Sequence, residues 1–193
     1  MLVNEIFHSL QGEGYHSGMA AVFVRMSGCN LDCPFCDTRH QSYTEMSEDE
    51  IVAEASRFHA PLLVLTGGEP ALQVTSSLVD RLKSKGFMVC IETNGTIALP
   101  QNIDWVTLSP KDAFVGPQAK PLLRKADELK VVFDGKHIPS DYQHIAASHR
   151  YIQPCDTGDS EQNRTITEQA VDYCLQHPEW QLSLQIHKLL NIR

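Results

Sequence analysis

Residues 21–36, AVFVRMSGCNLDCPFC, contain an apolar run followed directly by three closely spaced cysteines. The run AVFVRM is rich in β-branched and aromatic residues, which predicts a buried strand over 21–26. Cys29, Cys33 and Cys36 then follow with the spacing C-x3-C-x2-C. Three thiolates on one loop can each bind one iron of a [4Fe-4S] cubane and leave the fourth iron open to a reactive ligand. The segment therefore predicts a strand that leads into a metal-binding loop.

Two other uses of these cysteines compete with the cluster. Structural zinc normally takes four protein ligands, so it needs another Cys or His, for which His40 is a candidate. Redox thiols are the other interpretation, but three cysteines within eight residues are too crowded for a typical disulfide framework. Cys90 and Cys174 lie in apolar patterns and are expected in the core, whereas Cys155 receives no role. The spacing favours an iron–sulfur cluster.

Strand-like apolar runs alternate with helical patterns along the rest of the chain, which favours a parallel sheet with right-handed crossovers. A complete eight-stranded barrel typically needs about 250 residues, and this chain has 193. We therefore expect an α/β fold with an incomplete TIM-like barrel, a reduced helix layer and functional residues at the C-terminal strand ends. Strands are predicted at 21–26, 62–65, 88–92, 105–108, 129–133, 151–153 and 182–185.

Three helices are predicted from their end signals. Ser47 with Glu50 forms a capping-box pattern ahead of one helix, and Gly86 ends a second helix that carries Leu78, Val79 and Leu82. Thr165 with Glu168 repeats the capping-box pattern ahead of a third helix. The apolar face expected for that helix comprises Ile166, Ala170, Val171, Cys174 and Leu175.

Composition and charge narrow the class of protein. Hydrophobic residues make up 42% of the chain and no apolar run is long enough to cross a bilayer, so no membrane association is expected. The N-terminus lacks the pattern of a secretory signal, which places the chain in the cytoplasm. A net charge of -8 disfavours extended nucleic-acid binding. With no linker or repeat, residues 1–193 are expected to form one domain.

The cysteine spacing after a first strand, with Phe35 before the last cysteine, resembles the radical S-adenosylmethionine (SAM) superfamily. TGGEP at 66–70 follows the predicted strand at 62–65 and is similar to the superfamily's glycine-rich element, whose backbone holds SAM. Glycine suits that task because backbone without a Cβ can approach a ligand closely. Taken alone, GGEP is equally consistent with a simple turn.

Further segments resemble one family in particular, the 7-carboxy-7-deazaguanine synthases. They are EIFHSLQGEG (5–14), CDT (36–38), ETNG (92–95) with LSPKD (108–112), and SLQIHK (183–188), so the resemblance covers essentially the whole chain. It implies that Cys29, Cys33 and Cys36 bind the [4Fe-4S] cluster and that Thr38 contributes an oxygen to Mg²⁺. It implies SAM contacts from Phe35, Cys36, Asp37, Gly68, Ser109, Lys111 and Gln153. It implies substrate contacts from Leu10, Gln11, Gly12, Arg25, Thr66, Glu92 and His187.

Several of these residues also have a physical interpretation of their own. Arg25 lies inside an apolar strand, where an arginine needs an anionic partner: a substrate carboxylate or a protein carboxylate, unless the side chain points into solvent. Gln11 and Glu92 carry the donors and acceptors that match a pterin edge, but a Gly-rich turn and a turn cap explain them equally. Ser109 and Lys111 are also consistent with ordinary surface polarity, and an isolated His187 with a structural role.

The resemblance further implies a reaction. The substrate is 6-carboxy-5,6,7,8-tetrahydropterin, the product is 7-carboxy-7-deazaguanine with ammonia released, and SAM is regenerated, in 7-deazapurine (queuosine) biosynthesis. A flavodoxin or ferredoxin supplies the electron, and a homodimer covers the exposed sheet edges. A glycyl-radical activating enzyme has the same cysteine spacing, but the segments QGEG, ETNG and QIHK disfavour this alternative. A zinc-stabilised binding module is the alternative from another class, and iron content separates the two.

Overall fold

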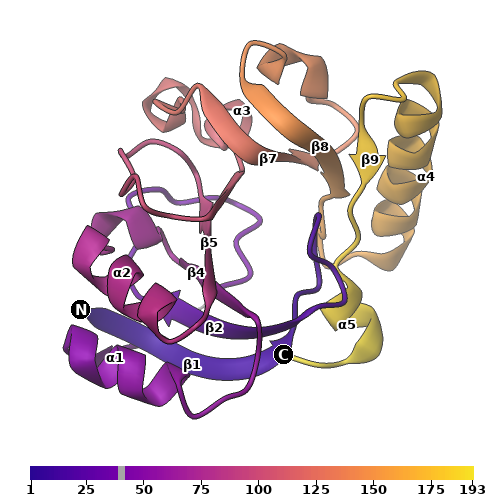
Figure 1. Cartoon of the computed structure of the whole chain (residues 1–193). Coiled ribbons are helices and arrows are strands. Elements are labelled where there is room, and N and C mark those ends of the chain that lie inside the picture. The colour runs from indigo at the N-terminus through magenta and orange to yellow at the C-terminus, as the bar shows by residue number, and fades with distance from the viewer. Residues whose placement is uncertain (39–41) are drawn as a thin grey trace.

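The strands form one curved sheet that does not close on itself. In the computed structural model, which describes residues 1–38 and 42–193, nine strands pair in the order β3-β1-β2-β4-β5-β6-β7-β8-β9. Figure 1 shows the sheet curling from β1 and β2 round to β7 and β8, which confirms the incomplete barrel. The strands are β1 Leu2–Leu10, β2 Ala20–Met26, β3 Thr44–Glu45, β4 Leu62–Gly67, β5 Met88–Thr93, β6 Trp105–Leu108, β7 Lys125–Phe133, β8 Ala146–Pro154 and β9 Gln181–Leu182.

Strand direction divides the sheet into two parts. β1 is antiparallel to both β2 and β3, whereas each neighbouring pair from β2 through β9 is parallel. The C-terminal ends of β2 and β4 to β8 therefore meet at one end of the barrel, as expected. β1 and β3 were not predicted, and the strand expected at 182–185 is the shorter β9.

The helix layer is sparse, as expected. It consists of α1 Glu48–Ala55, α2 Ser76–Ser84, α3 Asp112–Val115, α4 Ser160–Gln176 and α5 Ile186–Leu190, with 3₁₀ turns η1 Pro70–Leu72, η2 Pro117–Ala119 and η3 Pro139–Tyr142. The capping box at the start of α1 is confirmed, because Ser47 and Glu50 exchange side-chain and backbone hydrogen bonds. Gly86 follows α2 with a φ of +91°, as a glycine C-terminal signal requires. In the described part of the chain, no helix is long and apolar enough to cross a membrane.

The prediction for the start of α4 is wrong. The helix begins five residues earlier than Thr165, and Asp159 is its N-cap because its carboxylate accepts from the backbone N–H of Gln162. Thr165 lies inside the helix and donates its hydroxyl to the carbonyl of Glu161. The buried face consists of Ile166 and Ala170, while Leu175 is exposed.

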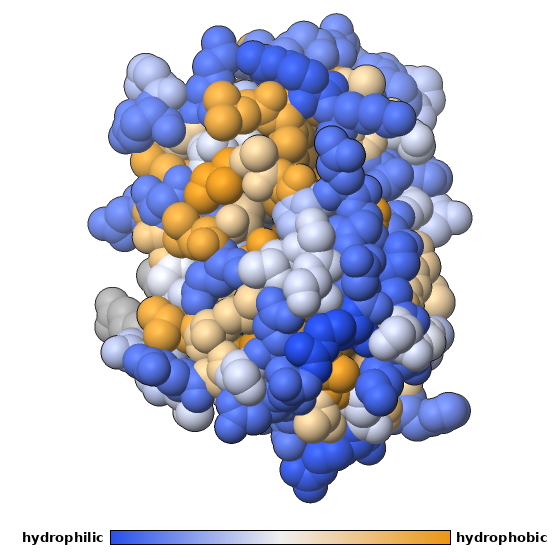
Figure 2. All heavy atoms as spheres, turned by 60° about the vertical axis from the view of Figure 1, so that its left-hand side comes forward, coloured by the Kyte–Doolittle hydropathy of each residue, from blue (hydrophilic) through white to orange (hydrophobic). Residues whose placement is uncertain are grey.

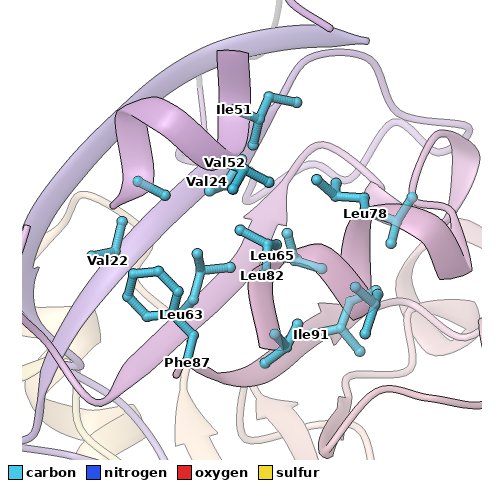
Figure 3. Close-up of a cluster of buried hydrophobic side chains, with 14 of the residues drawn as sticks. Val22, Val24, Ile51, Val52, Leu63, Leu65, Leu78, Leu82, Phe87 and Ile91 are labelled. Carbon is cyan, nitrogen blue, oxygen red and sulfur yellow. The ribbon is translucent and has the colours of Figure 1, made fainter. Parts of the chain in front are cut away.

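Alternation along the strands builds a core on each face of the sheet. Side chains of β2, β4 and β5 that point outward pack under α1 and α2, as Figure 3 shows for Val22, Leu63 and Ile91. A second outer core lies between α4 and strands β7 and β8, and Cys174 packs at its margin. The intervening residues face inward, where the rings of Phe7 and Phe23 stack with centroids 4.9 Å apart. Further along each strand, the same inward positions carry polar side chains.

The surface on the side of α1 and α2 is mixed. Figure 2 shows apolar side chains gathered in the upper part of this face, with hydrophilic residues along its lower and right-hand margins. Exposed large apolar side chains occur in loops that follow the parallel strands, among them Leu72, Leu122 and Ile138.

Candidate active site

One cavity of about 650 Å³ lies at the C-terminal ends of the parallel strands. Every residue to which the family resemblance assigns a site role lines it, although these residues come from both ends of the chain. They are Leu10, Gln11, Gly12, Arg25, Cys29, Cys33, Phe35, Cys36, Asp37, Thr38, Thr66, Gly68, Glu92, Ser109, Lys111, Gln153 and His187. The predicted set is thus brought together in space.

Three of these residues are placed by strand alternation alone. Arg25, Thr66 and Glu92 continue the inward-facing positions of β2, β4 and β5. Arg25 pairs in register with Thr66, and the preceding residue of β4, Leu65, pairs with Ile91, the residue before Glu92. A cation, a hydroxyl and a carboxylate therefore follow one another across three neighbouring strands.

The cysteine loop is joined to the glycine element through the backbone. The N–H of Gly68 donates to the carbonyl of Met26 at 3.0 Å, and the N–H of Glu69 donates to the carbonyl of Gly28 at 2.9 Å. A Cβ on Gly68 would lie 1.9 Å from the oxygen of Gly28, and one on Gly67 would lie 2.2 Å from the oxygen of Met26. Close packing between the two loops therefore requires these glycines even before a ligand is considered.

Glu69 anchors the glycine element to the next strand. Its buried carboxylate accepts from the hydroxyl of Thr93 and the backbone N–H of Asn94, both at 2.8 Å. Burial raises the pKa of Glu69, against these hydrogen bonds. Asn94 in turn donates to Asn30 of the cysteine loop at 3.0 Å. The loop is thus held by both β4 and β5.

The cysteines fit the requirements of a cluster that uses three ligands. All three thiols are free, and each lines the cavity. The backbone N–H of Leu31 donates to the sulfur of Cys29, which favours its thiolate, while burial raises the pKa of Cys29 and Cys33. Among residues 1–38 and 42–193, no three His, Cys, Asp or Glu side chains converge as a single metal ion requires. A cubane takes each cysteine on a different iron and needs no such convergence. His40, the candidate fourth zinc ligand, lies outside the described residues.

The residues predicted to bind SAM lie partly in the cysteine loop and partly elsewhere in the lining of the cavity. The ammonium of Lys111 donates to the carbonyl of Ser109 at 2.9 Å and to its hydroxyl at 2.5 Å. Burial lowers the pKa of Lys111 to about 8. Phe35 packs edge-on against Phe114, with ring centroids 4.7 Å apart. Gln153 accepts a hydrogen bond from the hydroxyl of Ser183 at 3.1 Å.

The turn after β1 connects the two ends of the chain across the cavity. The side-chain amide of Gln11 donates to Glu92 at 3.0 Å, and the carbonyl of Gly12 accepts from the N–H of Ile186 at 3.0 Å. A Cβ on Gly12 would lie 2.4 Å from Nδ1 of His187. Figure 1 shows this indigo turn beside α5 and the segment from β9. The expected turn therefore positions both Glu92 and His187.

Arg25 has the protein carboxylate that was one of the predicted alternatives. Its Nε lies 3.0 Å from Glu5, and its Nη1 donates to the hydroxyl of Thr38 at 3.3 Å. Glu5 also binds Arg193 at 2.5 Å. Arg25 nevertheless lines the cavity, so its guanidinium remains available to a second anion there.

Sequence reasoning missed several charged residues of the cavity. Lys130 pairs with Glu13 at 2.5 Å, and Lys188 joins Asp37 at 3.1 Å to Asp156 at 2.7 Å. Lys130 lies in the apolar run LKVVF, so like Arg25 it is a charged residue inside an apolar strand that needs an anionic partner, and this signal could have identified it. Lys188 ends the segment SLQIHK, but nothing in that segment indicates its carboxylate partners. Cys155 lines the same cavity and is buried.

The radical SAM superfamily model matches residues 23–113. The chain is 51% identical over 191 residues to the 7-carboxy-7-deazaguanine synthase of Bacteroides thetaiotaomicron, covering 99% of this chain and 98% of that protein. It is 39% identical to the protein of the same name from Bradyrhizobium diazoefficiens, with 99% and 98% covered. The crystal structure of QueE from Escherichia coli matches with a TM-score of 0.75 and 26% identity, over 95% of this chain and 93% of that one. The chain therefore belongs to the 7-carboxy-7-deazaguanine synthase family of radical SAM enzymes.

Proposed function

We propose that this enzyme converts 6-carboxy-5,6,7,8-tetrahydropterin to 7-carboxy-7-deazaguanine with release of ammonia, in 7-deazapurine (queuosine) biosynthesis. The observation that carries the proposal is the placement of Arg25, Thr66 and Glu92 in one cavity with the three cysteines. The cation and the carboxylate lie on strands separated by β4, so they can take opposite ends of a flat, carboxylated heterocycle.

The polar groups of the cavity suit the two ends of this substrate. The guanidinium of Arg25 would bind the substrate carboxylate, since arginine matches carboxylate geometry in a bidentate manner. Glu92 would accept hydrogen bonds from the N–H groups of the aminopyrimidinone ring. Leu10, Gln11 and Gly12 would cover the ring, with Thr66 and His187 at its margin.

The chain's own residues would hold the cofactors that the family implies. Cys29, Cys33 and Cys36 would bind the [4Fe-4S] cluster, and SAM would lie against Gly68, Ser109, Lys111 and Gln153 together with Phe35, Cys36 and Asp37. When bound, the cluster and SAM supply a radical that removes hydrogen from the substrate. Glu92 and Arg25 fix the orientation of the pterin relative to that chemistry. The enclosing turn and α5 exclude water from it.

We include Mg²⁺ in the proposal, with Thr38 as its protein ligand. Mg²⁺ prefers oxygen ligands and commonly keeps waters while it binds substrate oxygens, so one hydroxyl beside the substrate carboxylate is a sufficient protein contribution. The hydroxyl of Thr38 lies 3.3 Å from Nη1 of Arg25, the residue proposed to bind that carboxylate. The same short loop would then serve both the cluster and the substrate.

The remaining parts of the proposal concern assembly and electron supply. We propose a single radical SAM domain over 1–193, a cytoplasmic homodimer, and flavodoxin or ferredoxin as reductant. The outermost strands β3 and β9 have only two residues each, so they pair with little of the neighbouring strands β1 and β8. A second copy of the chain would cover the strand edges that they leave unpaired. Cys36 is exposed, so an electron donor can approach the cluster loop.

Anaerobic assay of the reconstituted enzyme tests the function. With dithionite, SAM, Mg²⁺ and the carboxytetrahydropterin, we expect 7-carboxy-7-deazaguanine and ammonia in equal amounts, detected by mass spectrometry and an ammonia assay. Cys33→Ala should give neither, and omission of Mg²⁺ or Thr38→Val should slow turnover. Failure of the wild-type enzyme, with full iron content, to form the product would overturn the substrate assignment.

A further inference from the structure

Lys130 is a charged residue in the middle of strand β7. It lies on β7, its side chain is only 6% exposed, and it pairs with Glu13 at 2.5 Å and with Glu92 at 3.6 Å. A buried ammonium is costly unless carboxylates surround it. Burial by itself would lower the pKa of Lys130, but Glu13, Glu92 and Glu128 raise it well above its ordinary value. Lys130 is therefore a buried cation, balanced by carboxylates, in the lining of the cavity.

The contacts around Lys130 form a closed network. Glu13, which lies in the turn after β1, also accepts from the side-chain amide of Gln185 at 3.0 Å. The N–H of Glu13 donates to the side-chain oxygen of Gln11 at 3.2 Å, and Gln11 donates from its nitrogen to Oε1 of Glu92. Lys130 approaches the other oxygen of Glu92, Oε2. The carboxylate of Glu92 is thus held on both of its oxygens before any substrate is present.

We propose that Lys130 is a positioning residue for substrate binding: it holds Glu92 oriented toward the aminopyrimidinone ring and fixes the turn that covers the ring. This inference rests on the proposed function. The 3.6 Å separation from Glu92 makes their interaction electrostatic, whereas Glu13 is the hydrogen-bonded partner that holds the ammonium in place. Lys130 therefore acts through Glu92.

Other titratable groups face this network. Glu128, two residues before Lys130 on β7, is buried and accepts from the N–H of Tyr15 at 3.1 Å. Lys111 after β6 donates to Ser109, and both Lys111 and His187 on α5 interact electrostatically with Glu13. Glu92 is the carboxylate of the set that both lines the cavity and is proposed to meet the ring.

Substitution of Lys130 by Met tests the role. Glu92 then loses the cation that lies 3.6 Å from its Oε2, so this oxygen is no longer held in place. We expect KM for the carboxytetrahydropterin to rise roughly tenfold or more, as loss of a charged contact implies, while kcat at saturating pterin changes little. Lys125→Met is the matched control, because Lys125 is an exposed lysine on the same strand. It should leave both quantities unchanged.

The double variant Glu13→Gln/Lys130→Met separates positioning from simple charge balance. It removes the buried pair, so we expect thermal stability and iron content to approach wild-type values while KM for the pterin stays raised and kcat stays close to wild type. Because no unbalanced charge is buried there, a raised KM reflects the lost contact with Glu92. Recovery of the wild-type KM in the double variant would overturn the proposal. If the wild-type enzyme does not act on the pterin at all, the proposed function fails instead.

Discussion

Gly68→Ala tests whether packing between the glycine element and the cysteine loop is what permits the cluster to bind. A Cβ at this position would lie 1.9 Å from the carbonyl oxygen of Gly28 and 2.5 Å from its carbon. Both atoms are backbone, so no side-chain rotation can relieve the contact. The loops must separate by about 1 Å to reach the 3.0 Å below which real Cβ contacts hardly occur. That movement displaces the backbone immediately before Cys29.

The energetic cost follows from the contacts that such a movement breaks. Two backbone hydrogen bonds join the loops, at 2.9 and 3.0 Å, and each contributes about 1 kcal/mol. Overpacking adds a further cost of roughly 1–3 kcal/mol if the loops do not separate fully. A total of about 2–5 kcal/mol corresponds to a decrease in melting temperature of roughly 4 to 20 °C for a chain of this size. The variant should therefore fold but hold the cluster poorly.

The assay compares iron and sulfide content after anaerobic reconstitution, SAM binding by titration, and the melting temperature of the apoprotein. Gly86→Ala is the matched control, because Gly86 has a positive φ and no heavy atom within 4 Å of the added Cβ. It should lose about 1 kcal/mol from backbone strain and keep full iron content. If Gly68→Ala binds iron and SAM like the wild type, or if Gly86→Ala loses iron equally, the packing argument is wrong.

Three further predictions concern the turn after β1 and α5. Gly12→Ala places a Cβ 2.4 Å from Nδ1 of His187, so steady-state kinetics should show a raised KM for the pterin, and an unchanged KM would contradict the role of this contact. Lys188→Met removes the ion pairs at 3.1 and 2.7 Å. Stability should fall by less than about 1 kcal/mol, but amide exchange in α5 should accelerate, and equal exchange rates would refute this. Burial alone would raise the pKa of Glu13, but Lys130 lowers it from 4.5 to about 2. Glu13 therefore stabilises the fold above pH 4.5, by on the order of 3 kcal/mol at most, and that contribution is lost as the pH falls toward 2. Unfolding of wild-type and Glu13→Gln apoprotein from pH 6 to 2 should show the difference shrinking with acid, and a constant difference would exclude the linkage.

The sequence predicted the parallel part of the fold because those strands are buried on both faces. AVFVRM and LLVL are nearly continuous apolar runs, as strands covered by helices on one side and a filled interior on the other must be. β1 escaped prediction because it is an outer strand. It pairs with β2 on one side and with the two-residue β3 on the other, so its polar residues interrupt the apolar pattern.

The helix error has a similarly local cause. Thr165 and Glu168 have the spacing of a capping box, but the same spacing occurs inside any amphipathic helix with polar residues on one side. Asp159 caps α4 through its own carboxylate, and Asp159 with Gln162 has a similar spacing, so two candidate helix starts compete in this stretch of sequence. Sequence spacing alone does not distinguish a helix start from the first turns of a helix already under way.

The site contains two kinds of residue. Some belong to short motifs that can be recognised in the sequence, and others reach the site only because of how the chain folds. Cysteines, glycines and the QGEG turn stand in short recognisable segments, so their positions could be inferred. The ion pairs of Lys188 could not, because its two carboxylate partners, Asp37 and Asp156, are far away in sequence and no local pattern connects either of them to Lys188. A network of charged residues depends on which strands become neighbours in the fold, and a short stretch of sequence does not contain that information.

Lys130 shows how such a network can still be anticipated. A lysine within an apolar strand needs carboxylates nearby to balance its buried charge, and this holds whether or not those carboxylates belong to a recognisable motif. On β7 the demand is met by Glu13 from one end of the chain and Glu92 from its middle, so the pairing also fixes the distance between the covering turn and the sheet. The ammonium of Lys130 thus balances the buried carboxylates and also orients Glu92 to accept hydrogen bonds from the N–H groups of the ring. Stability and substrate recognition share one buried charge, which is why the single and double variants at this position should separate them.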